Sequence, residues 1–339
     1  MGLALVAWAA PAGAAVTARG AVPDDPARAG WLERYAEARQ GPETVETVTQ
    51  TFKVGPQSSL DLTGISGDVK VTGGDGAEIR VEATKRVRHR NAADAKRLLG
   101  EVRIDFNQFN SRVEVRTVYP RRSTNGERGW SASVDYVVSV PSDAAVAIKT
   151  ISGNVVVTSV RGEVRAEAIS GDVDVSATPN LAVAKTVSGD VTARDVASAS
   201  TLVLGTVSGN VTASGLKVRL LECGSVSGDL NLSGVQVERV AAKSVSGNIM
   251  FDAPLAKGGR YEFTTHSGDV RVTVPAGAGF ELDANTFSGS VRSDLPVTLR
   301  GGGQGRERGA TRTIRGTHGD AGAYLAVRSF NGSVVILKK

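Results

Sequence analysis

Residues 186–191 read Thr-Val-Ser-Gly-Asp-Val, and the chain returns to this pattern again and again at a nearly constant interval. Successive serines of the pattern are 18 to 21 residues apart. Such a period, with apolar residues on both sides of the motif, is typical of one small supersecondary unit that stacks on copies of itself. The eight copies begin at Ser152, Ser170, Ser188, Ser208, Ser227, Ser246, Ser267 and Ser288.

Alignment of the copies on their serine shows a period-two alternation. Two, four and six residues before it stand apolar, small or hydroxylated side chains, as in Leu202, Leu204 and Thr206. Three residues before it stand mostly polar ones such as Lys149, and three residues after it comes Val, Leu or Ile, as in Val191. The alternation predicts a half-buried strand on each side of the tripeptide.

The tripeptide itself is predicted to turn the corner between these strands. Glycine adopts backbone conformations closed to other residues, and Ser, Asp and Asn bond back to nearby backbone groups. We assign these positions a structural role and identify no catalytic, cofactor-binding or metal-binding residue. The predicted corner residues are Ser152, Gly153, Ser170, Gly171, Asp172, Ser188, Gly189, Asp190, Ser208, Gly209, Ser227, Gly228, Asp229, Ser246, Gly247, Ser267, Gly268, Asp269, Ser288 and Gly289.

These patterns predict an all-β fold: a single-stranded parallel β-solenoid with coils of about 19–21 residues, right-handed as parallel crossovers usually are. The apolar residue directly before the serine leaves two possibilities. Either the corner bulges and turns it inward, or it forms an exposed apolar stripe. The residues concerned are Ile151, Ile169, Val187, Val207, Val226 and Val245.

The rest of the chain divides around this array. Residues Met1 to Ala15 are apolar and rich in alanine, and Ala12-Gly13-Ala14 has the form of a signal-peptidase site, although no Lys or Arg precedes it. We expect an exported protein that does not span the membrane once processed. The predicted regions are a signal peptide (1–15), a linker with a short amphipathic helix (16–43), an N-terminal β-rich capping region (44–145), the repeat solenoid (146–295) and closing strands (296–339).

The capping region contains a first copy of the motif, Ser66-Gly67-Asp68, set 86 residues before Ser152. Between them we expect strands at 78–87, 101–106, 112–119 and 132–140, a helix at 91–99 and a basic loop at 121–129. Because an exposed solenoid end invites edge-to-edge association, this region is predicted to cover one end of the stack. A degenerate motif, Asn331-Gly332-Ser333, suggests that residues 311–339 close the other end.

Charge and cysteine content limit which partners and cofactors are compatible with the sequence. The net charge is only +5, with acidic residues spread among the basic ones, which argues against a nucleic-acid partner. The single cysteine, Cys223, excludes an internal disulfide framework and a CxxC metal cluster. The corner Asp and Asn residues could bind calcium as a ladder, but the dense glycine spacing of calcium-binding repeats is absent, so we favour a structural role and no cofactor.

The repeats and the elements before them resemble the bacterial putative-adhesin family of β-strand-repeat proteins, a domain of unknown function. The resemblance covers about 44–339 and rests on the repeats together with 81–87 (Val-Glu-Ala-Thr-Lys-Arg-Val), 113–117 (Val-Glu-Val-Arg-Thr) and 136–141 (Tyr-Val-Val-Ser-Val-Pro). It implies a β-solenoid, usually in exported or envelope proteins, with no established enzymatic activity and no catalytic residues to carry over. The chain departs from its own pattern at Ser290, Ser333 and His266.

Three hypotheses for function follow. The first is a non-enzymatic exported protein that presents its surface for binding or a structural role in the cell envelope, its partner an unidentified envelope or surface protein or polysaccharide. The second is a carbohydrate-active solenoid lyase or hydrolase, which a carboxylate cluster on one sheet face would favour. The third is a module that senses envelope stress. Binding is expected on outward positions beside the corners, such as Lys149, Lys185, Lys243, Arg271 and Arg292.

Overall fold

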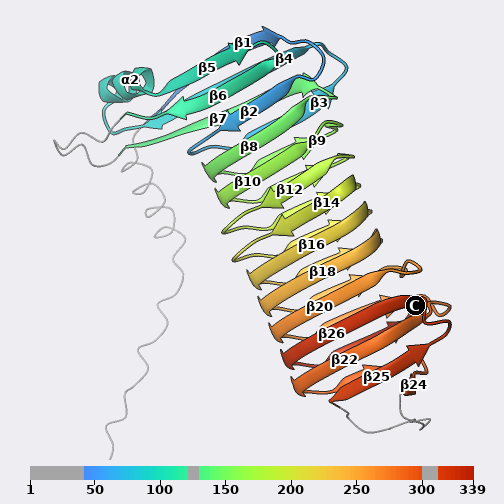
Figure 1. Ribbon diagram of the computed structural model, residues 1–339. Coiled ribbons are helices and arrows are strands. Elements are labelled where there is room, and N and C mark those ends of the chain that lie inside the picture. Colours follow the sequence, from blue (N-terminus) through green and yellow to red (C-terminus); the bar gives the residue numbers. More distant parts are fainter. Residues whose placement is uncertain (1–41, 121–129, 300–311) are drawn as a thin grey trace, which may run out of the picture.

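The computed structural model describes residues 42–120, 130–299 and 312–339. The expected signal peptide, the linker helix and the basic loop at 121–129 lie outside these residues. Within them the chain forms two long sheets, of 13 and 14 strands, which run along an elongated stack (Figure 1). The all-β prediction, with long parallel sheets, is confirmed.

Each repeat contributes one strand to each sheet, and we call this two-strand unit a coil. The strand before the corner pairs in parallel with its counterpart one coil away, for example Val146 with Val164. The strand after the corner does the same, as in Val173 with Val191. The strands before the corners are β8 (Ala145–Ser152), β10 (Val164–Ser170), β12 (Leu181–Lys185), β14 (Ala197–Gly205), β16 (Lys217–Ser227), β18 (Gln236–Ser246), β20 (Arg260–Ser267) and β22 (Phe280–Ser288). Those after them are β9 (Val155–Thr158), β11 (Val173–Ser176), β13 (Val191–Arg194), β15 (Val211–Ser214), β17 (Leu230–Ser233), β19 (Ile249–Asp252), β21 (Val270–Val274) and β23 (Val291–Ser293).

The first copy of the motif stacks directly on the second, although 86 residues separate them in the chain. Its strands β2 (Ser59–Thr63) and β3 (Val69–Gly74) pair with β8 and β9, and Ser66 bridges to Ser152. The residues before the first copy and those between the two copies add strands beyond this first coil. They are β1 (Glu43–Lys53), β4 (Glu78–Arg88) and β7 (Ser131–Pro141) in one sheet, and β5 (Arg103–Phe109) and β6 (Arg112–Val118) in the other.

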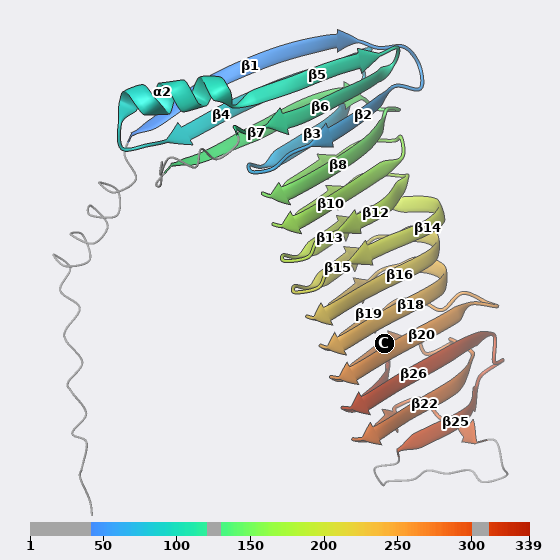
Figure 2. The ribbon, with the colours of Figure 1, turned by 60° about the vertical axis from the view of Figure 1, so that its left-hand side comes forward.

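The helix expected in this region is α2 (Ala92–Glu101), the helix described by the structure. It begins where the side-chain oxygen of Asn91 accepts a hydrogen bond from the Ala93 N–H at 2.9 Å, which is a favourable N-cap. The helix lies beside β1 and β4 (Figure 2). Its buried residues are Ala95, Leu98 and Leu99. The strands of the region occur where the pattern predicts them, with ends shifted by a few residues.

The other end of the stack differs from the expectation. Strand β26 (Ala323–Asn331) lies between β20 and β22, and β27 (Val334–Lys338) lies between β21 and β23 (Figures 1 and 2). The prediction that all of 311–339 closes the far end is therefore wrong for these two strands. Instead β25 (Thr313–His318) pairs antiparallel with β22, and β24 (Thr298–Leu299) pairs with β25. The interposed coil fits because Asn331-Gly332-Ser333 keeps the corner glycine and short polar neighbours.

Between the sheets lies one continuous apolar core. Most coils contribute valine, alanine and leucine, so the sheets pack on thin ladders of small side chains. Larger rings fill the core toward the far end, where Phe251 lies 5.2 Å from Phe263 and 5.7 Å from Tyr261 between ring centroids. The function of the molecule must therefore be sought on its outer surface and at its corners.

Candidate binding surface

The corner Asp and Asn residues form a continuous hydrogen-bonded ladder. The side-chain oxygen of Asp190, for example, accepts a hydrogen bond from the Asn210 backbone N–H at 2.7 Å, one coil further along. The same bond recurs from coil to coil at 2.7 to 2.9 Å. Since Asp and Asn both offer this acceptor, their alternation along the ladder follows from structure alone. The accepting residues are Asp68, Asn154, Asp172, Asp190, Asn210, Asp229, Asn248 and Asp269.

The corner glycines are required by a close approach between coils. Gly209 has φ +150°, and a Cβ built on it would collide with the carbonyl oxygen of Gly189 in the preceding coil. In most coils the backbone N–H of the corner glycine instead donates to the serine carbonyl of the next coil, as from Gly209 to Ser227 at 2.9 Å. Any side chain here would separate the coils.

A second ladder runs through the hydroxyl two residues before the serine. The Thr206 hydroxyl donates to the Gly189 carbonyl at 2.9 Å, and equivalent bonds recur in most coils. Thr150 is an exception, since its hydroxyl is buried without a hydrogen-bond partner. Ser, Gly, Asp and the preceding hydroxyl thus hold the corner together, as a structural role requires.

The calcium alternative gains no support from this geometry. One side-chain oxygen of each ladder residue already accepts a backbone N–H. Across residues 42–120, 130–299 and 312–339, no group of three or more His, Cys, Asp or Glu side chains is arranged to hold a metal ion. Two of the three histidines contact aromatic rings instead, His266 at Phe330 and His318 at Phe280.

The residues directly before the corner serines form an exposed apolar stripe. Strand alternation continues through them, so Thr206 points inward and Val207 points to solvent. Between 43% and 64% of the surface of eight such residues is accessible, which decides between the two possibilities left by the sequence. In stack order, the apolar stripe consists of Ile65, Ile151, Ile169, Val187, Val207, Val226, Val245, His266, Phe330 and Phe287.

The far end of the apolar stripe is aromatic. The rings of His266 and Phe330 stack at 4.8 Å between centroids with 4° between their planes, and Phe287 stacks on Phe330 at 4.7 Å and 5°. Sequence reasoning singled out six members of the apolar stripe and missed Ile65, Phe287 and Phe330. Ile65 and Phe287 can be identified from the sequence as the residues before Ser66 and Ser288. The place of Phe330 can be found only once the order of the coils is known.

The expected basic positions lie on both sides of the apolar stripe and do not form one cluster. Lys149, Lys185 and Lys243 are exposed on the strands before the corners, whereas Arg271 and Arg292 are exposed on strands after them. The Lys149 ammonium lies 3.8 Å from the Glu167 carboxylate. Lys149 is thus accompanied by an opposite charge on the neighbouring coil.

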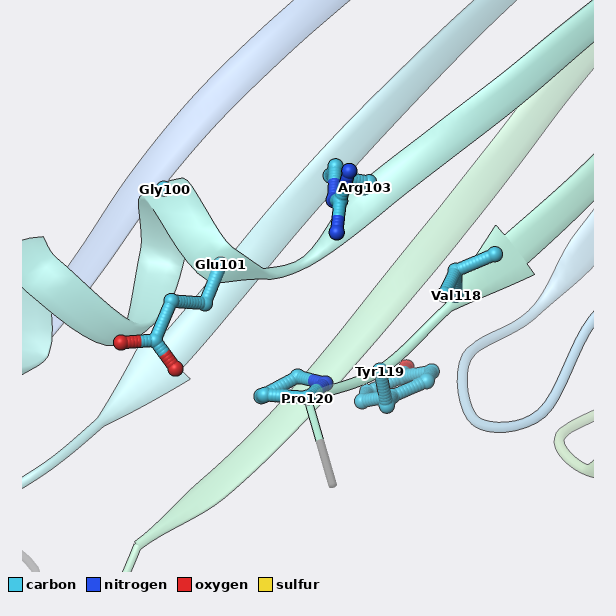
Figure 3. Close-up of a pocket in the computed structure, with 6 residues that line it drawn as sticks. All are labelled: Gly100, Glu101, Arg103, Val118, Tyr119 and Pro120. Atoms are coloured by element: carbon cyan, nitrogen blue, oxygen red, sulfur yellow. The ribbon is translucent and has the colours of Figure 1, made fainter. Parts of the chain in front are cut away.

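Two hollows occur at the capping end. One, of about 520 Å³, lies between the end of α2 and the end of β6 and is lined by Gly100, Glu101, Arg103, Val118, Tyr119 and Pro120 (Figure 3). Burial raises the pKa of the Tyr119 phenol, which donates a hydrogen bond to the Ser66 carbonyl at 3.3 Å. A neutral phenol that supports the backbone is a structural group rather than a catalytic base.

The other hollow, of about 300 Å³, lies on the outer face of β5, β6, β2 and β8. Its lining includes the carboxylates of Asp61, Asp105 and Glu114. The cations in it are Arg112, Arg116 and Lys149. The Arg112 guanidinium lies 2.7 Å from Asp61 and 3.1 Å from Glu114. Two of the three carboxylates are therefore already paired with the same cation.

The two parallel sheets, the corner ladders and the thin core define a repeat protein whose candidate functional features lie on its outer surface. The chain belongs to the Toastrack DUF4097 family, whose profile matches residues 136–336. The domain has no known function, and the resemblance found in the sequence is confirmed. No curated protein matches the chain. In the described parts of the chain, no helix is long and apolar enough to cross a membrane.

Several solved structures match most of the chain at low identity. A putative adhesin from Bacteroides fragilis NCTC 9343 has a TM-score of 0.42 at 10% identity, covering 86% of this chain and 97% of its own. A putative adhesin from Parabacteroides distasonis ATCC 8503 has a TM-score of 0.39 at 10% identity, with coverages of 88% and 98%. A putative lipid binding protein from the same strain has a TM-score of 0.39 at 14% identity, with coverages of 86% and 97%.

Proposed function

We propose that this chain is a non-enzymatic, exported repeat protein whose right-handed β-solenoid presents the apolar stripe as a binding surface in the cell envelope. The observation that carries the proposal is the exposure of eight large apolar side chains in a row along one corner, which only His266 interrupts. Single exposed apolar residues are ordinary, but a contiguous row of them marks an interaction site.

The chemistry of the corner supports a separate role for the apolar stripe. The serines, glycines and Asx residues of the corner are engaged in bonds between coils, so they hold the stack. The apolar stripe adds nothing to the buried core, because its side chains point away from it. Stacking between neighbouring strands accounts for part of their apolar character, since β-branched and aromatic side chains pair well across strands. The apolar surface that stays exposed along the whole row is typical of an interaction site.

The carbohydrate-active alternative has one observation in its favour, the three carboxylates of the hollow on β5, β6 and β2. Pairing of Asp61 and Glu114 with Arg112 opposes it, since the same cation already engages both carboxylates. Glycoside hydrolysis requires one protonated and one ionised carboxyl group. The envelope-sensing alternative would use the same apolar stripe with a regulatory partner.

Co-sedimentation of the full chain with envelopes of the producing bacterium tests the proposal. The apolar-stripe variant Val187→Ser with Val207→Ser should lose most envelope binding. The matched control, Thr192→Ser with Thr212→Ser, changes outward residues of the same two coils on the other sheet and should bind as the parent does. Equal binding by all three proteins would refute a binding role for the apolar stripe, and fractionation of producing cells tests export.

A further inference from the structure

We infer that the apolar stripe is the contact surface between two copies of this chain, which associate corner to corner. The inference rests on the proposed function, because it names the partner of the same surface. It is drawn from the extent of the apolar stripe, from the spacing of its side chains and from the residues beside it.

The size of the apolar stripe suits a protein interface. The eight exposed members of the apolar stripe leave between 43% and 64% of their surface accessible. Exposed in one row, they form an apolar patch of roughly a few hundred Å², the size at which an exposed patch marks an interaction site. A stable protein interface covers about 800 Å² on each partner. The apolar stripe can therefore supply the apolar centre of a dimer interface, and the columns beside it would complete the area.

The spacing of the side chains in the apolar stripe matches that of a second copy. Neighbouring side chains of the apolar stripe follow the separation of paired strands, and the rings of Phe287, Phe330 and His266 stack at 4.7 and 4.8 Å. A partner that contacts every coil must carry apolar groups at this same interval. A second copy carries them by construction, and rows of side chains stacked at about 4.8 Å form dry interfaces when two such rows meet.

A partner chain can approach the middle of the apolar stripe closely, because the residues beside it there have no side chains. The neighbouring column, three residues before each serine, carries Lys185 and Lys243 on either side of two glycines, Gly205 and Gly224. These glycines stand beside Val207 and Val226, the fifth and sixth of the ten positions. The column thus lacks side chains where a two-fold axis would pass, and a two-fold interface needs a self-complementary surface around its axis.

Other partner chemistries fit less well. Sugars bind open aromatic faces, but both faces of the Phe330 ring are covered, by His266 and by Phe287. Anionic polymers require a row of cations, and His266 is the one ionisable side chain in the apolar stripe. A lipid surface would accept the same apolar groups, so it is kept as an outcome of the test.

Sedimentation equilibrium of the full chain over a range of concentrations is the first experiment. The parent protein should be a dimer. The variant Val207→Lys with Val226→Lys should raise the dimer dissociation constant at least about a hundredfold, because two charges would be desolvated at the centre of the interface. The control, Thr212→Lys, places a charge on the outward face of β15 in the same coil and should remain dimeric.

A cross-linking experiment provides the second measurement. Val207→Cys lies near the middle of the apolar stripe, so it faces the partner whether the two stacks run in the same or in opposite directions. A short bis-maleimide should join two copies of this variant but not two copies of Thr212→Cys. The native thiol does not interfere, because burial raises the pKa of Cys223 to about 12.

The outcomes separate this inference from the proposed function. A parent protein that is monomeric at all concentrations, but binds envelopes through the apolar stripe, overturns the dimer and leaves the proposed function standing. Binding of that monomer to phosphatidylglycerol vesicles, lost in the double-lysine variant, assigns the apolar stripe to lipid instead. A dimer that the lysines leave intact also overturns the inference. Far-ultraviolet circular dichroism of each variant distinguishes a lost interface from a lost fold.

Discussion

The carboxylate of Asp229 accepts a hydrogen bond from the backbone N–H of Asn248 at 2.7 Å, and so ties its coil to the next one at the corner. Asp229 in turn donates its own N–H to the side-chain oxygen of Asn210 at 2.9 Å. Each corner residue is thus donor to one neighbour and acceptor for the other. This arrangement needs only one side-chain oxygen as an acceptor. The other atom on the same carbon can be the second oxygen of Asp or the nitrogen of Asn.

We therefore expect Asp229→Ala to lower the free energy of unfolding by about 1–2 kcal/mol, because the Asn248 N–H loses its acceptor. Asp229→Asn keeps the acceptor and should change the free energy of unfolding by less than about 0.5 kcal/mol. Urea denaturation followed by circular dichroism measures both. Equal effects of the two substitutions would contradict the ladder.

Gly209→Ala should lower the free energy of unfolding by about 3 kcal/mol or more, because the new Cβ collides with the Gly189 carbonyl and the backbone φ is positive. Gly205→Ala is the matched control in the same coil. Its Cβ would meet the Gly224 carbonyl oxygen at 3.6 Å and the Lys185 Cγ at 3.8 Å, both ordinary contacts. A stability loss of similar size in both variants would show that the corner glycine has no special role.

The hydroxyl ladder makes a prediction of opposite sign at two equivalent positions. Thr206→Val removes the bond to the Gly189 carbonyl and should lower the free energy of unfolding by about 1 kcal/mol. Thr150→Val removes a buried hydroxyl that has no partner, so it should raise the free energy of unfolding by about 1 kcal/mol. Thermal or urea denaturation of the two variants side by side decides, and destabilisation by both would refute the prediction.

The buried thiol predicts a loss of stability at alkaline pH. Desolvation raises the pKa of Cys223 from its ordinary 9.0 to about 12 in the folded chain. Below pH 9 the thiol is protonated in both states and its contribution is fully present. Between pH 9 and 12 the unfolded chain loses this proton while the folded chain keeps it, which lowers the free energy of unfolding by about 1.4 kcal/mol per pH unit.

Cys223→Ala should lack this part of the pH dependence, and the substitution is mild because Ala242 occupies the same column in the next coil. Urea denaturation of the parent and the variant at pH 8, 10 and 11 measures the difference. The two curves of stability against pH should diverge above pH 9. Curves that stay parallel would mean that the thiol ionises as readily in the folded chain as in the unfolded one.

The repeat itself could be predicted because buried and exposed positions alternate along each strand. Leu204 and Thr206 read as inward and Lys185 as outward from their chemistry, and the structure places them so. Val207 is the informative exception, since its apolar side chain argues for burial while its place in the alternation argues for exposure. Sequence alone could not resolve that conflict, because it depends on where the backbone bends relative to the serine.

The order of the last coils was beyond prediction for another reason. All coils share one parallel register. The residues around Phe330 therefore do not show whether its coil follows that of Phe287 at the end of the stack or lies between the coils of Phe287 and His266. The choice is made by packing over the whole length of the neighbouring strands. The long insertion after Asp68 is equally hard to predict. Coils that are neighbours in a stack can be separated by any number of residues in the chain.

Strands β26 and β27 also have a consequence for biosynthesis. A ribosome delivers the coil of Ser288 before the coil of Asn331, yet Ser288 pairs with Asn331, which in turn pairs with Ser267. The Ser288 coil thus lacks its layer of support until the later residues emerge, and this end of the stack must assemble out of chain order. Coils can be added from the N-terminal side during translation as far as Ser267. The last coils form only after residues far apart in the chain have met, and such non-local pairing slows folding.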